Sequence, residues 1–516
     1  MTDVALAARA VVLATLVGCA GGPPSKDVSP AGDDDTGTPD SDSAPDSDSA
    51  PDSSPDSGGD TGDSGEPVRE TSTYTLSVDL GAKLLGEESG DSYGHRTGVA
   101  GAGDVDGDGT VDLLVAQAQN DRGGQDAGAV YLVRSPAHGA IDLSAADAIL
   151  YGSTAGELAG WTVDSAGDVD ADGYADVLVG APYWPGVKPY EGRAYLLRGP
   201  LAGERDLATA DAVLHGEPSS DPTCETWSQT GSSLGSAGDV DGDGYGDLLV
   251  GAPGHDCGDG AAYLLRGPVD GALELSDAAD TTFVGDRYLV GYFVGSAGDS
   301  DGDGLDDPLI GAPAGERRIV MFQAPGSGTL SFDDAEAWLS QGTDSYEGSG
   351  CFAVGDTNGD GYDDLLAGNS LSDEAGDYAG AASLFLGPFS GARSLDAPDA
   401  RLLGGEPYAY ATANRSAGDV NGDGRADLLL SSSTYALGEW RAGTSYVVFG
   451  PVFGTLVLDE ADVILQGEGG DDAAGGGVSP GDVDGDGLDD LFIGGGGDDD
   501  GGDDAGAAWL VYAANL

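Results

Sequence analysis

Short apolar runs recur along the chain from about residue 76 to its end, separated by a few polar or glycine residues. In the third unit, a Gly/Ala/Ser-rich stretch leads into an acidic segment, and the runs 247–253 and 261–268 follow. A fourth segment, of the form L-S-x-A-D-A-x-L-x-G-E, recurs at 143–152, 207–217 and 395–406. Apolar runs of this length, flanked by Gly, Pro and Asp, are typical of short β-strands. The pattern therefore predicts four strands in each unit.

Seven such units follow one another, at spacings of 57 to 71 residues. Small sheets repeated around an axis leave few exposed edges, so we predict an all-β fold, a seven-bladed β-propeller with four-stranded blades, over residues 73–516. The seventh unit stops after its third run, 507–511, whereas a lone fourth segment lies at 80–87, ahead of the first unit. We expect this N-terminal strand to pair with the last blade and close the ring, because an open solenoid would need caps.

An acidic nonapeptide recurs once in every unit. It has oxygen-bearing side chains at positions 1, 3, 5 and 9, and glycine at position 6. Calcium takes about six to eight oxygen ligands, and a tight loop can supply alternate side chains together with the backbone carbonyl of position 7. Glycine at position 6 permits the positive φ of a sharp turn. Asp and Gly also form ordinary turns, but turn formation alone would not select an acid at position 9.

We therefore predict about seven bound Ca²⁺, one in each loop. The predicted ligands, loop by loop, are Asp104, Asp106, Asp108, Thr110 and Asp112; Asp168, Asp170, Asp172, Tyr174 and Asp176; Asp239, Asp241, Asp243, Tyr245 and Asp247; Asp299, Asp301, Asp303, Leu305 and Asp307; Asp356, Asn358, Asp360, Tyr362 and Asp364; Asp419, Asn421, Asp423, Arg425 and Asp427; and Asp482, Asp484, Asp486, Leu488 and Asp490.

The composition of the chain limits the classes of partner that it can bind. The chain has 91 Gly and 25 Pro, as expected of many short elements joined by turns, and a formal net charge of −72. That charge makes nucleic acid and anionic lipid surfaces improbable partners. Like-charged carboxylates repel inside each loop in the absence of metal, so we expect folding to depend on calcium.

The N-terminus has the pattern of a targeting segment. An apolar run from Val11 to Val17 ends in Leu16-Val17-Gly18-Cys19, which resembles a bacterial lipoprotein lipobox. The resemblance implies a signal peptide over 1–18, lipidation of Cys19, and a chain held in the bacterial cell envelope, at the outer membrane or cell surface, by its lipid alone. An ordinary cleaved secretory signal is the alternative. Residues 19–72, rich in Pro, Asp, Ser and Gly, are predicted to be a disordered linker.

The units resemble the FG-GAP repeats of the integrin α-subunit N-terminal domain, a seven-bladed β-propeller with calcium in the hairpin loops between the first and second strands. The tripeptide Gly-Ala-Pro stands at 180–182, 251–253 and 311–313, and the other four units depart from it. The Gly of the FG element is kept at Gly160, Gly231, Gly291 and Gly348, mostly without its Phe. The resemblance covers residues 76–516 and implies a fold and calcium, not a ligand.

Cysteines and aromatic residues suggest what lies opposite the calcium loops. Cys224 and Cys257 fall in connections that a propeller brings to that face, so a disulfide is expected there if the protein is exported; two free thiols are the alternative. Cys351 is expected to be buried. The candidate ligand-binding aromatics in connections on the same face are Tyr183, Trp184, Tyr190, Trp227, Tyr435 and Trp440, with local packing of long loops as an equal alternative.

The sequence thus predicts a monomeric, non-catalytic module that binds a protein or a glycan. Residues 231–235 match G-x-S-x-G, but that motif needs a strand, a turn and a helix, and here it runs into an acidic loop. A phospholipase-like hydrolase would need converging groups outside the seven loops, and the sequence offers none. A purely structural envelope component is the remaining alternative.

Overall fold

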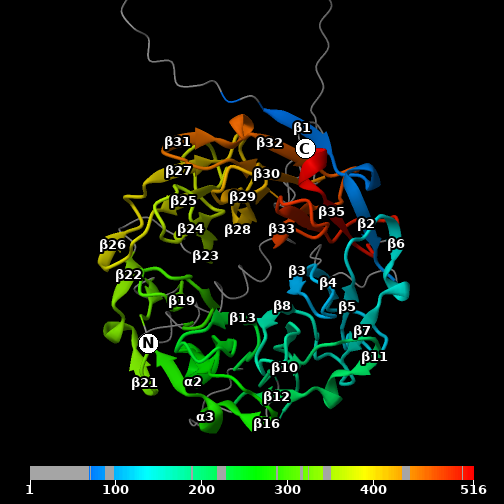
Figure 1. Ribbon diagram of the computed structural model, residues 1–516, viewed down its shortest axis with the longest axis vertical. Coiled ribbons are helices and arrows are strands. Elements are labelled where there is room, and N and C mark those ends of the chain that lie inside the picture. The colour runs from blue at the N-terminus through cyan, green and yellow to red at the C-terminus, as the bar shows by residue number, and fades with distance from the viewer. Residues whose placement is uncertain are drawn as a thin grey trace, which may run out of the picture.

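The computed structural model describes residues 69, 71–87, 98–186, 190–217, 228–285, 289–313, 318–323, 325–340, 350–432, 442–502 and 504–516. Within these residues the strands form seven sheets of five strands each, arranged around a central axis (Figure 1). The predicted seven-bladed β-propeller is therefore confirmed. The predicted signal peptide, Cys19 and almost all of the predicted linker lie outside the described residues. No helix in the described part is long and apolar enough to cross a bilayer.

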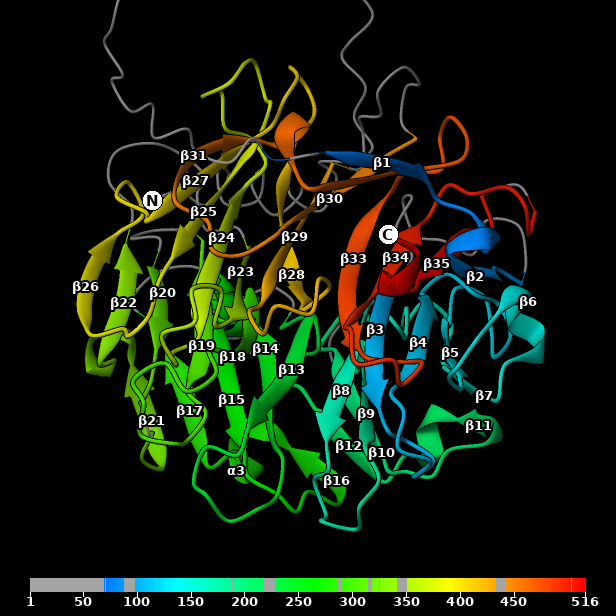
Figure 2. The same cartoon turned by 45° about the horizontal axis from the view of Figure 1, so that its top comes forward.

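Each blade is built from four antiparallel strands, with the first strand nearest the axis (Figure 2). In blades 1 to 3 they are β3 (Gly98–Gly103), β4 (Asp112–Gln117), β5 (Ala129–Val133) and β7 (Ala148–Tyr151); β8 (Thr162–Gly167), β9 (Asp176–Ala181), β10 (Arg193–Leu197) and β12 (Ala212–His215); and β13 (Ser233–Gly238), β14 (Asp247–Ala252), β15 (Ala261–Leu265) and β17 (Thr281–Val284). In blades 4 and 5 they are β18 (Phe293–Ser296), β19 (Pro308–Ala312), β20 (Arg318–Met321) and β22 (Ala337–Ser340); and β23 (Gly350–Gly355), β24 (Asp364–Asn369), β25 (Ala381–Phe385) and β27 (Ala400–Leu403). In blades 6 and 7 they are β28 (Thr412–Gly418), β29 (Asp427–Ser432), β30 (Thr444–Val448) and β32 (Val463–Gln466); and β33 (Ala474–Gly481), β34 (Asp490–Gly495), β35 (Ala507–Val511) and β2 (Gly81–Leu85).

A fifth, outermost strand, which the sequence analysis missed, comes from a neighbouring unit. In blade 1, β11 pairs in parallel with β7, although β11 belongs to the second sequence unit. Each blade therefore borrows a short strand from the unit that follows it. In the order of blades 1 to 7, these strands are β11 (Gly203–Asp206), β16 (Gly271–Glu274), β21 (Gly328–Ser331), β26 (Gly391–Ser394), β31 (Gly454–Val457), β1 (Ser72–Thr75) and β6 (Gly139–Asp142).

The fourth sequence segment begins with a single helical turn rather than a strand. In blade 1, Asp142 caps this turn through Ser144 N–H, and the turn's first residue, Leu143, is fully buried. The buried residue anchors the turn before the fourth strand starts. The short helices of the described residues are η1 (Val78–Leu80), η2 (Leu143–Ala145), η3 (Leu207–Thr209), α2 (His255–Gly258), α3 (Leu275–Ala278), η4 (Phe332–Asp334), η5 (Leu458–Glu460) and η6 (Ala513–Asn515).

Two N-terminal strands close the ring. As predicted, β2 becomes the fourth strand of blade 7 and pairs with β35, with Ala82 opposite Leu510. In addition, β1 is the fifth strand of blade 6, where Ser72 lies beside Val463 of β32. Arg69, in the predicted linker, pairs with Asp462 and donates to the carbonyl of Phe449, 3.1 Å away. Figure 1 shows these N-terminal strands beside the C-terminus.

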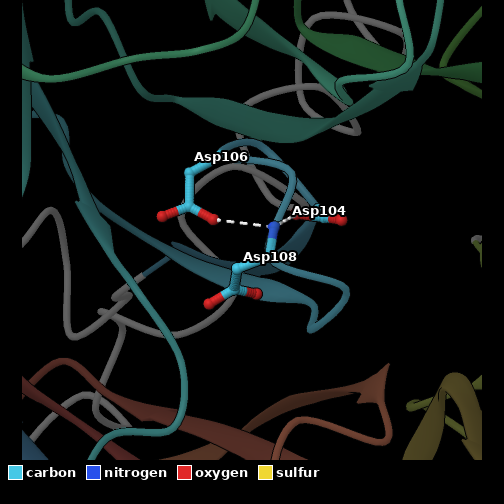
Figure 3. A group of neighbouring side chains, drawn as sticks. All are labelled: Asp104, Asp106 and Asp108. Carbon is cyan, nitrogen blue, oxygen red and sulfur yellow. Dashed lines mark hydrogen bonds between the residues drawn. The ribbon is translucent and has the colours of Figure 1, made fainter.

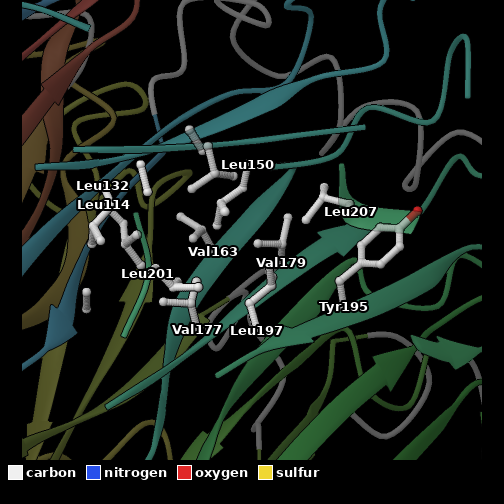
Figure 4. Close-up of a cluster of buried hydrophobic side chains, with 14 of the residues drawn as sticks. Leu114, Leu132, Leu150, Val163, Val177, Val179, Tyr195, Leu197, Leu201 and Leu207 are labelled. Atoms are coloured by element: carbon white, nitrogen blue, oxygen red, sulfur yellow. The ribbon is translucent and has the colours of Figure 1, made fainter. Parts of the chain in front are cut away.

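The core consists of apolar layers between adjacent blades. One layer joins Leu114 and Leu132 of blade 1 to Val163 and Val179 of blade 2 (Figure 4). Each other pair of neighbouring blades, including 7 and 1, encloses a comparable cluster of described residues. Because the strands bury both faces, they read as continuous apolar runs instead of alternating ones.

The innermost strands line the hub and are made mostly of small residues. Gly231 has φ 82°, and a Cβ added there would lie 2.4 Å from the carbonyl oxygen of Arg193. This close approach explains why the Gly of the FG element is kept where its Phe is lost. One ion pair spans the hub, from Arg415 of β28 to Asp164 of β8, at 2.8 Å. It joins blades 6 and 2, which are not neighbours.

Candidate metal centres

All seven acidic nonapeptides occupy the hairpin between the first and second strands of a blade. The loop that begins at Asp104 joins β3 to β4, and a bulge at the end of β3 turns the chain into it. The first and second strands of every blade bracket a loop in the same way. The sequence therefore brings the predicted ligands together at one end of the hairpins.

Backbone N–H groups hold the carboxylates of each loop in place. In the first loop, Asp104 accepts the N–H groups of Gly107, Asp108 and Gly109 at 2.7, 3.0 and 2.9 Å. Figure 3 shows the bond from Asp108. Asp108 accepts the N–H of Thr110 at 2.9 Å. The bonds from position 6 to position 1 and from position 7 to position 5 recur in all seven loops. The position 6 glycines all have φ between 83° and 93°, as the motif predicts.

The Asp at position 9 is buried in every loop. In the sixth loop, Asp427 accepts the N–H of Val420 at 3.1 Å and that of Gly450 at 2.9 Å. Gly450 belongs to the turn after the third strand, so this side chain ties the loop to the blade. Burial, more than the nearby carboxylates, raises the pKa of Asp427 to about 7, and that of Asp112 to about 6. A cation beside these groups would stabilise their charged form.

The donor set fits calcium. Carboxylate oxygens of three residues lie within 4.8 Å of one another in the loops of Asp104, Asp168, Asp239 and Asp299. Asp170 Oδ1 and Asp307 Oδ1 are buried, yet among the described residues neither has a hydrogen-bond donor. A buried acceptor without a donor is costly unless a cation satisfies it. Hard oxygen ligands in this number suit calcium better than a transition metal.

Successive loops are linked around the ring. The N–H of Ala175, at position 8 of the second loop, donates to the carbonyl of Asp104 at 2.8 Å, and Gly246 donates to Asp168 in the same way. The fifth and sixth loops, and the sixth and seventh, are joined by the same bond. One loop therefore cannot shift without affecting its neighbour.

Among the described residues, arginines that follow a third strand contact three of the loops. Arg134, Arg198 and Arg266 lie 3.2 Å from the position 3 carboxylates of Asp106, Asp170 and Asp241. Each guanidinium also donates to a backbone carbonyl of the next unit, for example Arg198 to Val269 at 2.8 Å. Blade 4 has Gln323 at this place, and its side-chain amide donates to the carbonyl of Phe389 at 3.2 Å.

Three of the predicted aromatic residues, Tyr183, Trp184 and Tyr190, are described, and they lie on the face opposite the loops. Tyr183 lies between Trp161 and Tyr190, with ring centroids 5.2 and 5.3 Å away. The guanidinium of Arg193 stacks 3.4 Å above the ring of Trp184. All three aromatics are half-buried. Tyr183 and Tyr190 pack on each other, whereas Trp184 packs on Arg193 and on His215. Trp227, Tyr435 and Trp440 lie outside the described residues.

A second aromatic group, not predicted from the sequence, lies between blades 5 and 6. Tyr378 follows β24, whereas Tyr408 and Tyr410 precede β28. The ring of Tyr378 is 5.9 Å from that of Tyr408 and 5.8 Å from that of Tyr410, to which it is inclined by only 21°. Tyr378 is 43% exposed and Tyr408 is 47% exposed. Tyrosine was missed here because the residues lie about 30 positions apart and outside any apolar run.

The cysteine predictions have mixed outcomes. Cys257 is disulfide-bonded. Its predicted partner, Cys224, lies outside the described residues, so the pairing stays a prediction. Cys351 is free and buried, as expected, and burial raises the pKa of its thiol to about 12. Ser233 of the G-x-S-x-G segment starts β13, and its hydroxyl accepts the N–H of Val294 at 2.9 Å, so the strand, turn and helix of that motif are not formed around it.

A further acidic cluster surrounds a lysine in blade 7. The ammonium of Lys83, on β2, lies 2.6 Å from Asp500, 2.8 Å from Asp498 and 3.0 Å from Glu468. Lys83 is 3% exposed and also lies 5.1 Å from the ring centroid of Trp509. Burial lowers the pKa of Lys83, but the three carboxylates outweigh burial and raise it above its ordinary value. The cation position of this cluster is thus filled by the protein itself.

The acidic hairpins lie in segments that are similar to a known repeat. The FG-GAP repeat profile matches residues 159–197, 230–265 and 352–385. Three of the seven blades are thus similar to FG-GAP repeats. Each match runs from the start of a first strand to the third strand of blade 2, 3 or 5, and so includes an acidic loop. Blade 5 matches the profile although it lacks Gly-Ala-Pro.

The propeller is similar in sequence to integrin alpha chains. Human integrin alpha-IIb is 36% identical over 177 residues, which cover 33% of this chain and 16% of that protein. Integrin alpha-PS2 of Drosophila melanogaster is 28% identical over 239 residues, covering 43% and 16%, and integrin alpha pat-2 of Caenorhabditis briggsae is 28% identical over 243 residues, covering 46% and 19%. The matched region thus spans less than a fifth of each relative.

Among solved structures, the crystal structure of BBS1N in complex with ARL6DN, soaked with lead, superimposes with a TM-score of 0.44 at 10% sequence identity. The superposition covers 83% of this chain and 96% of that one. A likeness this loose carries no argument about function.

Proposed function

We propose that the protein is a calcium-binding β-propeller, anchored in the bacterial cell envelope through a lipid on Cys19, that binds a protein or glycan partner without catalysis. The acidic hairpin loops and the likeness to integrin alpha chains support the calcium sites. The exposed tyrosines between blades 5 and 6 support the binding role, and they are the observation on which that role depends.

Calcium bound in the loops neutralises carboxylates that otherwise repel one another. In the fourth loop, the residues that would hold it are Asp299, Asp301, Asp303 and Asp307, together with the carbonyl of Leu305. The loop N–H groups already orient the first and third of these carboxylates, and the burial of Asp307 excludes water from the floor of the site. The role that these residues support is to stiffen the ring, not to perform a reaction.

The fold does not require tyrosine at positions 378, 408 and 410. The N–H of Tyr410 donates to the carbonyl of Tyr378, and the equivalent bond in the preceding blades joins Leu158 to Asp126, Gln229 to Tyr190 and Leu289 to Gly258. Tyr408 corresponds in the same way to Gly156. The same backbone hydrogen bonds therefore form when these positions hold Asp, Gly, Leu or Gln.

The backbone at these positions makes tyrosine unfavourable. The φ angles of Tyr378, Tyr408 and Tyr410 are 52°, 64° and 53°, in the region that bulky side chains avoid. Each such residue costs on the order of 1 kcal/mol relative to an unstrained one. Three strained and clustered tyrosines, two of them more than 40% exposed, are better explained by contact with a partner than by packing.

The test replaces each tyrosine with a residue that the repeat already uses at the same place: Tyr378→Gly, as Gly258; Tyr408→Gly, as Gly156; and Tyr410→Leu, as Leu158. The net charge is unchanged, and glycine tolerates the backbone conformation, so the melting temperature should be kept. Wild type and the triple variant are compared on an array of neutral, acidic and amino glycans and on immobilised cell-surface proteins. Loss of the wild-type signal is expected.

A matched control is Trp184→Leu, which changes the packed aromatic group of blade 2 instead. If the triple variant keeps every wild-type signal, the tyrosines are not the binding surface. If Trp184→Leu alone abolishes the signal, the binding surface lies on blade 2.

The proposed anchor has a separate test. Radiolabelled palmitate should enter the full-length chain expressed in a bacterial host and should not enter the Cys19→Ala variant. Equal labelling of both chains, or labelling of neither, would contradict lipidation at Cys19.

A further inference from the structure

We propose that the seven calcium sites are unequal: the fourth and seventh loops bind calcium more tightly than the other five. In the first three loops the protein's own arginines compete with the ion, and in the fifth and sixth loops a carboxylate is missing. This inference rests on the proposed calcium binding.

The competing arginines are held in place by contacts outside the loops. Arg198 lies 3.2 Å from Asp170 and donates to the carbonyl of Val269, and the Gly199 that follows it donates its N–H to Asp176 at 2.9 Å. The guanidinium is 24% exposed, so water screens it only in part. A fixed positive charge on a ligand of the ion repels the ion, and therefore lowers its affinity. Arg134 and Arg266 repeat this arrangement in the first and third loops.

The fifth and sixth loops have fewer charged ligands. Asn358 and Asn421 stand at position 3, where the other loops have Asp, so each loop offers three carboxylates instead of four. The sixth loop also has Arg425 at position 7, with its guanidinium 3.6 Å from the carboxylate of Asp423. Affinity of calcium loops follows the number of charged ligands.

The fourth and seventh loops have four Asp ligands, and the residues in the place of Arg198 are Gln323 and Tyr512, which are uncharged. A carboxylate at position 8 of the following loop can raise the calcium affinity of the loop before it. Asp306, at position 8 of the fourth loop, accepts the N–H of Asp239 in the third loop at 3.0 Å and partly offsets the charge of Arg266. The second loop faces Gly246 there, so Arg198 gives the cleanest comparison.

The repeat supplies reciprocal variants. Arg198→Gln installs the residue of blade 4, whose amide makes the same kind of bond to the next unit. Gln323→Arg does the reverse. We expect Arg198→Gln to tighten calcium binding at the second loop, and Gln323→Arg to weaken it at the fourth, each on the order of tenfold.

Calcium is titrated against a competing chelator, and the number of bound ions is counted by native mass spectrometry at each free concentration. The wild type should fill in two phases, with two ions in the first. The first phase should rise to three ions in Arg198→Gln and fall to one in Gln323→Arg. Terbium luminescence, excited through the tyrosines beside the loops, provides a second readout of total site occupancy. Unchanged melting temperatures at saturating calcium show that both variants fold.

Two results would overturn the inference and are distinct from each other. Seven ions bound in a single phase, unaffected by either substitution, would leave calcium binding intact and remove the grading. No ion bound at any concentration would remove the proposed calcium function itself.

Discussion

Lys83 provides a direct test of how the ring is closed. It lies on β2, the N-terminal strand that completes blade 7, and its ammonium meets three carboxylates from the rest of that blade. The substitution is Lys83→Ile, because Ile149 and Ile464 occupy the equivalent place in the fourth strands of blades 1 and 6. Ile therefore fits the strand, and what changes is the charge.

The magnitude follows from the burial of the partners. Asp498 is 4% exposed, so removal of the lysine leaves its carboxylate in the protein interior without a cation. Breaking a buried ion pair by removal of one partner costs about 3–5 kcal/mol. Asp500 is 64% exposed and adds little to this figure, because water screens its charge. We therefore expect the free energy of unfolding to fall by about 3–5 kcal/mol.

The measurement is chemical denaturation at saturating calcium, together with hydrogen exchange of the folded state. Exchange should rise first in β2 and in β6, which pairs with it, while blades 3 and 4 keep their protection. The double variant Lys83→Ile/Asp498→Asn removes both charges and uses the residue of blade 1, Asn120, in place of the acid. It should recover most of the lost stability.

Either of two results would refute this reasoning. A loss below about 1 kcal/mol for Lys83→Ile would place the cluster in a solvated surface, where ion pairs contribute little. A double variant no more stable than Lys83→Ile would mean that the loss comes from packing of the lysine stem and not from the unpaired carboxylate.

Three further predictions concern the loops and the hub. Without calcium, the free energy of unfolding should fall as pH rises from about 4 to 7, because Asp112 and Asp427 have pKa values of about 6 and about 7 in the folded state, above the unfolded value, and the folded state loses its extra protons over that range. The gain in melting temperature on adding calcium should therefore be larger at pH 7.5 than at pH 5. A gain that is independent of pH would contradict this prediction. Asp427→Asn should lower the free energy of unfolding by about 1–3 kcal/mol even without calcium, because the NH₂ of the new amide would face one of the two backbone N–H donors that Asp427 now accepts. Urea unfolding of the metal-free protein measures this loss. A loss seen only with calcium would mean that Asp427 acts through the ion alone. Arg415→Ala should cost no more than about 1 kcal/mol, because Arg415 is 43% exposed; a larger shift in the denaturation midpoint would mean that the hub excludes water.

Most of the architecture follows from the sequence because its signals are local and repeated. The nonapeptides mark each first hairpin, and the lone segment at 80–87 predicts the closing strand β2, which the structure confirms. The fifth strands were missed for a physical reason. A strand such as β11 has one side on β7 and the other in solvent, so the sequence of Gly203–Asp206 carries polar residues and no apolar run.

The positions of the acidic loops were predictable from the sequence, whereas the side chains that reach each loop from elsewhere were not. Which arginine reaches a loop depends on the turn after the third strand, about 30 residues from the loop's first Asp, as in Arg198 and Asp168. The aromatic group of Tyr378, Tyr408 and Tyr410 is likewise assembled by two connections that only the folded ring brings together. Long-range contacts of this kind leave no periodicity to read.

The borrowed strands also bear on how such a chain can change its number of blades. Because every unit lends one strand to the blade before it, the sequence unit and the spatial blade are out of phase all around the ring. A duplication or deletion of one whole unit, cut at any point, still leaves each remaining blade with a lender. The insertion point is therefore unconstrained by the blade boundaries, and only the two N-terminal strands, β1 and β2, must stay at the opposite end of the chain from β35 for the circle to join.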